Sequence, residues 1–258
     1  MSTGISTRTS ANTRTGTAVL KAEARLFTRE PAALFWILAF PTLLLVVIGC
    51  IPAFREPSAD LGGLRTVDLY VPIAILLATI TSAIQSMPPV LSGYRERGIL
   101  RRMATTPMRP GALINAQIAL HGAAVVGSAL IALTVGRLAF GVALPRQLAG
   151  YLLALVLAAL SALALGATVS AISRTTKITQ AVGSAVFFPA MFTSGVWLPV
   201  AAMPETLRDI VGLTPLGASA QALDQAAAGQ WPSWTHLAVT AVWTVVLVAA
   251  ARRWFIWE

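Results

Sequence analysis

Charged residues are scarce in this chain of 258 residues. Asp, Glu, Lys and Arg make up 11% of it, whereas an ordinary soluble domain carries about 25%. Hydrophobic residues reach 56%, and they gather in blocks of about 20, the length that crosses a hydrocarbon core about 30 Å thick. A water-soluble fold of this size has too little polar surface to cover so much apolar material. The composition therefore predicts a protein that crosses a membrane several times.

Residues that usually build metal and catalytic sites are also few. With one cysteine, Cys50, and two histidines, His121 and His236, the chain has no internal disulfide and no metal-ligand spacing. Neither of its lysines, Lys21 and Lys177, lies in the G-x-x-x-x-G-K-[ST] context of a phosphate-binding loop. Motifs of zinc proteases, serine hydrolases and dinucleotide-binding enzymes are absent too. We therefore expect no catalytic residue, no metal ligand and no directly bound cofactor, so any ATP hydrolysis must come from a partner.

Six apolar segments are long enough to span a bilayer, at about 33–53, 69–91, 113–135, 148–171, 180–200 and 235–251. The fifth carries Pro189, Gly195 and Pro199, so we expect it to be kinked or broken. Residues 201–230 are too polar to span and too apolar for a plain loop, which predicts short helices that dip into the membrane interface before the last span. The segments together predict an all-α polytopic membrane protein with six transmembrane helices.

The segment before the first span divides into two parts. Residues 1–16 are small, polar and rich in Thr and Ser, which predicts a disordered tail. Residues 17–31 place apolar and basic side chains on different faces of a helix, so we expect an amphipathic helix lying in the membrane interface. Residues 32–258 then form a single six-helix transmembrane domain.

Basic residues fall mainly on one side of this topology. Of the 19, fourteen lie on the side of both termini and five on the other. Because cytoplasmic loops carry the excess of Lys and Arg, the N- and C-termini are predicted to be cytoplasmic and residues 201–230 extracellular. The net charge of +9 would suggest nucleic acid in a soluble protein. Here membrane topology explains it, and we expect no nucleic-acid partner.

None of the 29 charged residues falls within the expected spans. Ion-coupled carriers usually place such residues at membrane depth, so an ion-coupled secondary carrier is disfavoured. It stays an alternative, as does a membrane scaffold without transport. The polar residues that do fall within spans either line a substrate path or hydrogen-bond between helices. They include Gln85, Asn115, Gln117, His121 and Gln180.

Two spans carry a small residue at every fourth position, which lets helix backbones approach closely. The stripes serve either packing within the chain or a homodimer seam. They are Ala154, Ala158, Ala162, Gly166 and Ser170 in the fourth span, and Ala124, Ser128, Ala132 and Gly136 in the third.

Five arginines gather between the second and third spans, in the stretch SGYRERGILRRMATTPMRPG, residues 92–111. We expect a helix over about 93–104, with Ile99, Leu100 and Met103 on one face. The stretch is either a solvated loop that sets orientation and touches anionic lipid, or a helix that docks on a protein partner.

Two motifs carry a family resemblance. Residues 93–117 resemble the cytoplasmic segment of ABC transporter type 2 permeases, with its E-R-G-x-L-[KR]-x-[LM]-x-[AT]-[TS]-P core at 96–107. Residues 187–230 resemble the later block of the same family, F-P-x-x-F-x-S-G-x-x-x-P followed by M-P and a T-P-L turn. Both stand in the expected order. Within the family, the chain is similar to daunorubicin and other drug-resistance permeases.

The resemblance implies the permease subunit of an ATP-driven exporter in the bacterial cytoplasmic membrane. Its substrate would be a drug, an antibiotic or another amphiphile, with lipid and glycan as further options. The implied partners are two cytoplasmic ABC ATPase subunits, which use ATP and Mg, and a second permease copy in a homodimer or heterodimer.

The resemblance also assigns roles to residues. ATPase coupling would fall to Tyr94, Arg95, Glu96, Arg97, Gly98, Leu100, Arg101, Met103 and Pro107. The candidate substrate path, near the second and fifth spans, would include Gln85, Phe187, Phe188 and Phe192. A re-entrant gate would be formed by Ser194, Gly195, Pro199, Pro204 and Pro215.

Overall fold

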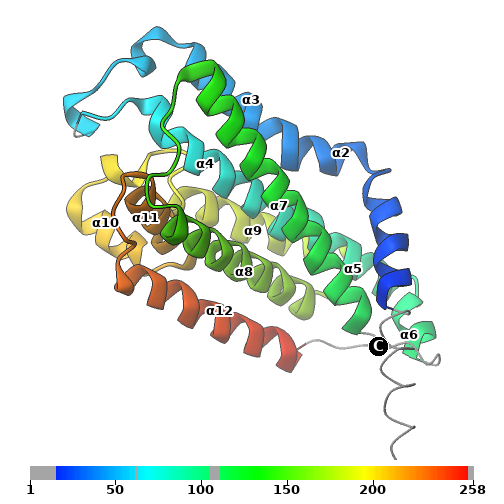
Figure 1. Ribbon diagram of the computed structural model, residues 1–258. Coiled ribbons are helices and arrows are strands. Elements are labelled where there is room, and N and C mark those ends of the chain that lie inside the picture. The colour runs from blue at the N-terminus through cyan, green and yellow to red at the C-terminus, as the bar shows by residue number, and fades with distance from the viewer. Residues whose placement is uncertain (1–15, 62, 105–110, 255–258) are drawn as a thin grey trace, which may run out of the picture.

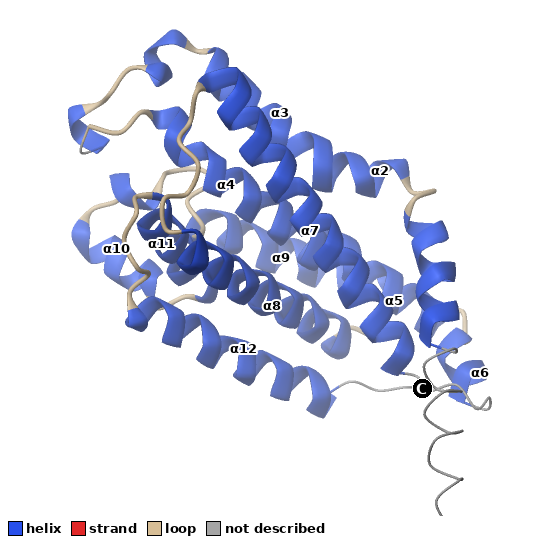
Figure 2. Ribbon diagram, in the orientation of Figure 1, coloured by secondary structure: helices blue, strands red, loops and turns tan. Residues whose placement is uncertain are grey.

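The computed structural model describes residues 16–61, 63–104 and 111–254. In these ranges the chain is helical and has no β-strand, only one isolated bridge between Pro57 and Arg65 (Figure 2). A helix over residues 16–27, here called the N-terminal helix, comes first. The elements that follow are α2 (Pro31–Leu34), η1 (Phe35–Ala39), α3 (Phe40–Cys50), η2 (Pro52–Arg55), η3 (Ala59–Leu61), α4 (Thr66–Ile80), η4 (Thr81–Ser86), α5 (Met87–Glu96), α6 (Ile99–Ala104), α7 (Gly111–Phe140), α8 (Leu148–Ile172), α9 (Thr176–Thr193), η5 (Val200–Ala202), α10 (Glu205–Gly212), α11 (Pro215–Ala227) and α12 (Trp234–Trp254).

Five described helical stretches are long and apolar enough to cross a membrane. They are Pro31–Cys50, Thr66–Glu96, Gly111–Phe140, Leu148–Ile172 and Trp234–Trp254. Each coincides with one of the expected spans, which confirms a multi-pass, all-helical membrane protein. The remaining expected span, 180–200, falls on α9, which ends earlier, at Thr193, and is not among the five. The six-span topology and the side of each terminus stay predictions.

The stretch α4–η4–α5 forms the centre of the bundle. Its most apolar window is 89% buried, compared with 22% for the first and the last spanning stretch. Helices α3 and α7 pack along α4, whereas α8 and α9 pack along η4 and α5 (Figure 1). A helix that is hydrophobic all round is a buried helix, and residues 69–78 of α4 are apolar on every face.

Two short π-helical segments interrupt the first and second spanning stretches, and a proline explains each of them. Pro41 follows η1, and Pro88 and Pro89 follow η4. A proline ring clashes with the carbonyl four residues earlier, which here belongs to Ile37 of η1 or to Ile84 and Gln85 of η4. A wider π turn keeps the helix continuous past such a clash.

The stripes of small residues are buried within this chain. All members of the α8 stripe and of the α7 stripe lie in the interior. A Cβ atom added to Gly166 would overlap the backbone carbonyl of Ala83 in η4, and one added to Gly136 would overlap the side chain of Val71. Both stripes therefore serve packing between helices of one chain, the first of the two alternatives.

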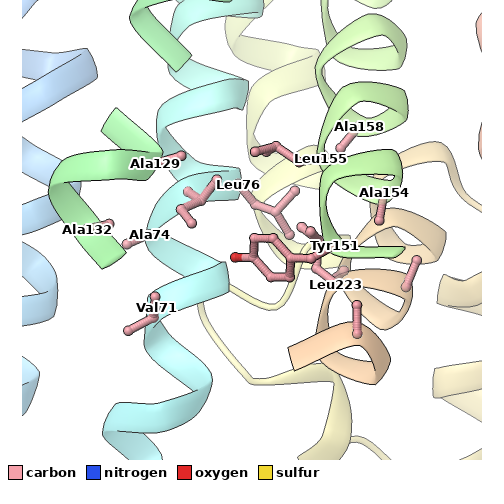
Figure 3. Close-up of a cluster of buried hydrophobic side chains, with 14 of the residues drawn as sticks. Val71, Ala74, Leu76, Ala129, Ala132, Tyr151, Ala154, Leu155, Ala158 and Leu223 are labelled. Carbon is pink, nitrogen blue, oxygen red and sulfur yellow. The ribbon is translucent and has the colours of Figure 1, made fainter. Parts of the chain in front are cut away.

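The two ends of the bundle differ in charge and in structure. One end, here called the basic end, holds the N-terminal helix, α6 and the ends of α5, α8 and α12, with Arg95, Arg101 and Arg252 among its cations (Figure 1). The opposite end holds η2, η3, α10 and α11. There, Tyr151 and Leu223 lie in an apolar cluster that joins α4, α7, α8 and α11 (Figure 3).

Replacing Gly166 with alanine tests the close approach of α8 to η4. Alanine favours a helix over glycine by about 1 kcal/mol, but the overlap with the Ala83 carbonyl forces a backbone shift that costs about 1–3 kcal/mol. We expect Gly166→Ala to lower the melting temperature in detergent. The matched control is Gly122→Ala on α7, where an added Cβ meets nothing within 4 Å. Equal melting temperatures for both variants would contradict the packing described.

Candidate functional site

The end of α5 is tied to α8 and α9 through two side chains of opposite charge. The Arg95 guanidinium donates to the carbonyl oxygens of Ser170 at 3.1 Å and Ser173 at 2.5 Å, at the C-terminal end of α8. The Glu96 carboxylate accepts from the backbone N–H of Thr176 at 2.9 Å and from its hydroxyl at 2.6 Å, at the start of α9. A cation at a helix C-terminus and an anion at an N-terminus both complement the helix dipole. The pair thus joins α5 to both helices.

Gly98 separates α5 from α6, so the continuous helix expected over 93–104 is wrong. Its φ of +66° lies in the left-handed region, which glycine adopts at little cost. The turn gives a physical reason for the glycine of the E-R-G motif. It also leaves Arg97 in the turn after α5 while Arg101 lies on α6, so the two arginines are not i,i+4 neighbours on one continuous helix.

Helix α6 is held by its apolar face. Leu100 is only 1% exposed and lies in a cluster with Tyr94 and Leu113, against which Val19 of the N-terminal helix packs. The Arg101 side chain on the other face is exposed. The helix therefore presents a basic surface outward while its apolar side is anchored to three other elements.

A buried carboxylate connects the N-terminal helix to α5 and α7. Glu23 is 7% exposed; its carboxylate accepts from the Tyr94 hydroxyl at 2.9 and 3.1 Å and from the Gln117 side-chain amide at 2.6 Å. One turn further along, the Phe27 ring meets the His121 ring edge-on, with centroids 5.3 Å apart. The His121 Nδ1 lies 2.9 Å from the Gln117 carbonyl oxygen. The contacts of His121 and Gln117 thus join the N-terminal helix to α7.

A lateral cleft of about 920 Å³ opens between the first spanning stretch, α4–η4–α5 and α9. Both π-helical segments face it, η1 with Trp36 and η4 with Thr81 and Gln85. π-Helical turns are rare and occur frequently at functional sites. Two of them on the walls of one cavity distinguish this cleft from ordinary gaps between helices.

Aromatic rings and uncharged polar groups line the cleft. Trp36 is 50% exposed and Phe188 56%, so both rings are open to contact. The amides of Gln85 and Gln180 also line it, and their side chains have no hydrogen-bond partner among the described residues. Such a lining suits an amphiphile, which buries apolar surface against the rings and orients itself by a few hydrogen bonds.

The predicted path residues meet in this cleft with one exception. Gln85, Phe187 and Phe188 line it, whereas Phe192, one turn further along α9, does not. At the basic end the cleft is bounded by Tyr94 and Arg97 of the predicted coupling segment, and Tyr94 is also the residue that bonds to Glu23. Gln180, one of the intramembrane polar residues for which a path was one of two alternatives, also lines it. Other lining residues were not expected from the sequence: Glu30, Trp36, Phe40 and Thr176.

The predicted gate residues lie toward the opposite end and are not part of the cleft. Gly195 has a φ of +85° and ends α9, where the sequence predicts a break. Pro204 and Pro215 stand at the starts of α10 and α11, as suits a residue without an N–H. Ser194 is buried, and Pro107 of the coupling prediction lies outside the described residues.

Comparison with known proteins gives the family. The family model described as ABC-2 type transporter matches residues 16–226. No curated protein matches the chain. The chain belongs to the ABC-2 type transporter family, whose members are membrane components of transporters and typically non-catalytic themselves. In the ranges that the structure describes, no three His, Cys, Asp or Glu side chains gather to hold a metal ion.

Glu23 generates a prediction with a defined pH dependence. Burial raises the pKa of Glu23 above the ordinary 4.5, and the nearby charge of Glu30 raises it further. The hydrogen bonds from Tyr94 and Gln117 lower the pKa, but burial has the larger effect. The docked helix therefore binds a proton more readily than the undocked one. Docking is strongest below pH 4.5 and weakens as pH rises through the raised pKa.

We expect Glu23→Leu to release the N-terminal helix, because two buried donors lose their acceptor at about 1–3 kcal/mol each. Glu23→Gln keeps an acceptor and removes the charge, so it should dock at least as well and lose the pH dependence. Hydrogen exchange over residues 16–27, corrected for the intrinsic rate at each pH, measures this. Glu56→Gln, which neutralises an exposed carboxylate at the opposite end of the bundle, serves as the control. If residues 16–27 of Glu23→Leu exchanged as slowly as those of the wild type, the Glu23 carboxylate would not be what holds the N-terminal helix.

Proposed function

We propose that this protein is the permease subunit of an ATP-driven ABC exporter in the bacterial cytoplasmic membrane. It moves a drug, an antibiotic or another amphiphile outward, with lipid or glycan as further substrate classes. Two cytoplasmic ABC ATPase subunits hydrolyse ATP with Mg, and a second permease copy completes the transporter. Membership of the ABC-2 family and the lining of the cleft support this proposal.

One observation carries the proposal: three successive residues at the end of α5 bond to three separate elements. Tyr94 reaches the N-terminal helix, Arg95 reaches α8, and Glu96 reaches α9. The exposed basic surface of α6 follows directly after them. A force that an ATPase applies to α6 is therefore transmitted to several helices at once.

The lateral cleft is the proposed substrate path. On the orientation predicted from the arginines, its end at Tyr94 and Arg97 faces the cytoplasm. An amphiphile would enter from the cytoplasmic side, lie against Trp36 and Phe188, and leave past the proposed gate of α10 and α11. The second permease copy would cover the exposed aromatic side of the cleft.

Reconstitution tests the function. The tagged permease is purified from its host, the co-purifying ATPase is identified, and the complex is placed in proteoliposomes with a fluorescent amphiphilic drug. We expect ATP-dependent transport by the complex and no ATP hydrolysis by the permease alone. Transport driven by an ion gradient without ATP would overturn the proposal in favour of a secondary carrier. An intact complex that transports no amphiphile would instead favour a scaffold.

The docking surface is tested by reversing one charge. Arg101 is exposed on α6, so Arg101→Glu should leave the fold intact and reduce ATPase recovery and coupled transport by about tenfold. Arg137→Glu is the matched control, because Arg137 is also exposed and lies at the opposite end. Both variants are compared by co-purification and by transport per ATP hydrolysed. Equal recovery of ATPase from both would exclude α6 as the docking element.

The substrate path is tested by removing an aromatic wall. Phe188→Ala takes away a ring that a bound amphiphile would cover, so the KM for transport should rise by about tenfold while basal ATPase activity is kept. Leu138→Ala is the control, since Leu138 is 81% exposed and lines no part of the cleft. An unchanged KM in Phe188→Ala, together with an unchanged KM in Gln85→Leu, would place the path elsewhere.

A further inference from the structure

A second cavity, of about 450 Å³, lies toward the basic end on a different face of the bundle. It is formed mainly by the start of α7, the second half of α8 and the end of α12, and we call it the α7–α12 groove. It shares no lining residue with the lateral cleft. In Figure 1, α8 runs between α7 and α12, so it forms the floor of the groove.

Small side chains on α8 create the groove. Helix α12 packs closely along α8, whereas α7 touches α8 at few places. Ala164 and Ala167 lie on the floor between them. Neither side chain is long enough to bridge the gap, so the space between α7 and α12 stays open to the surrounding bilayer.

The polarity of the groove changes along its length. Its walls and floor are apolar over most of their extent, with Ile114, Ile118 and Val248 among the lining residues. Polar side chains gather at the basic end, where Asn115 and Arg252 line it. Both are exposed, and neither has a side-chain partner among the described residues. No carboxylate is among the lining residues.

The dimensions match one leaflet of a bilayer. From Thr244 to Arg252 the groove follows α12 for eight residues, or about 12 Å at 1.5 Å per residue. A hydrocarbon core is about 30 Å thick, so the groove spans most of one leaflet. The hydroxyl of Thr244 is already donated to the Thr240 carbonyl at 2.8 Å, which leaves that inner end of the groove apolar.

We propose that the α7–α12 groove is a binding site for an anionic phospholipid of the leaflet at the basic end. One acyl chain lies on Ala164 and Ala167, and the phosphate receives hydrogen bonds from the Arg252 guanidinium and the Asn115 amide. A guanidinium matches a phosphate in charge and geometry. A cation at the mouth, with no carboxylate among the lining residues, favours a lipid with net negative charge over a zwitterionic one. This proposal does not depend on the proposed transport function.

The binding measurement compares defined lipids and matched variants. Delipidated protein in detergent is titrated with phosphatidylglycerol, phosphatidylcholine and inorganic phosphate, and bound lipid is counted by native mass spectrometry. We expect one tightly held phosphatidylglycerol, about tenfold weaker binding of phosphatidylcholine, and no binding of inorganic phosphate at the same concentrations. Arg252→Gln should weaken phosphatidylglycerol binding about tenfold. Arg253→Gln, at the adjacent arginine that does not line the groove, should leave it unchanged.

A filling variant tests the acyl chain separately from the phosphate. Ala167→Leu occupies the floor of the groove, so it should also remove the bound lipid although Arg252 is intact. If that variant unfolds, Ala251→Leu fills the same groove from α12. Equal effects of Arg252→Gln and Arg253→Gln on phosphatidylglycerol binding would overturn the proposal, because the lipid would then be attracted by the overall positive charge and not held by Arg252. The proposal would also be overturned if phosphatidylglycerol and phosphatidylcholine bound with equal affinity, or if inorganic phosphate bound and neither lipid did. Undiminished phosphatidylglycerol binding in the filled variants would overturn it as well.

Discussion

The approach of α8 to the central helix at Gly166 and Ala83 is the contact on which the rest of the bundle depends. Within a bilayer, lipid is as apolar as the helices, so association depends on close packing. The stripe of small residues on α8 allows that packing because its short side chains let the neighbouring helices come close, and every member of the stripe is buried. Helices α11 and α12 then pack on α8, and α9 is tied to its end through α5. A side chain at Gly166 would shift all three together.

Both cavities arise from irregularities around this same contact. On one side, the prolines that follow η1 and η4 in the sequence widen the helices into π turns, and the lateral cleft opens between these turns. On another side, Ala164 and Ala167 of α8 line the floor of the α7–α12 groove, where α7 and α12 do not meet above their short side chains. Small residues of α8 thus allow close packing where a neighbouring helix lies against them, and they leave a groove where no helix lies against them.

The sequence predicts what depends on local composition and misses what depends on contacts between distant residues. The spanning stretches follow from runs of apolar residues, and the end of α9 follows from Gly195. The turn at Gly98 was missed, although glycine is the one residue that adopts such a φ at little cost. Glu23 stands among basic residues of an amphipathic segment and would be placed in solvent by its pattern. Only its distant partners, Tyr94 and Gln117, account for its burial.

The geometry of α5 explains how one short segment can control both walls of the cleft. Successive residues of a helix point about 100° apart, so three in a row face three directions. Tyr94 holds the N-terminal helix, which leads directly into α2 and η1 on one wall. Glu96 holds the first residue of α9, the other wall. Because both bonds leave the same helical turn, rotation of that turn moves the two walls in a fixed relation to each other. This turn also lies next to α6, so an ATPase docked on α6 as proposed would act on the width of the cleft through it.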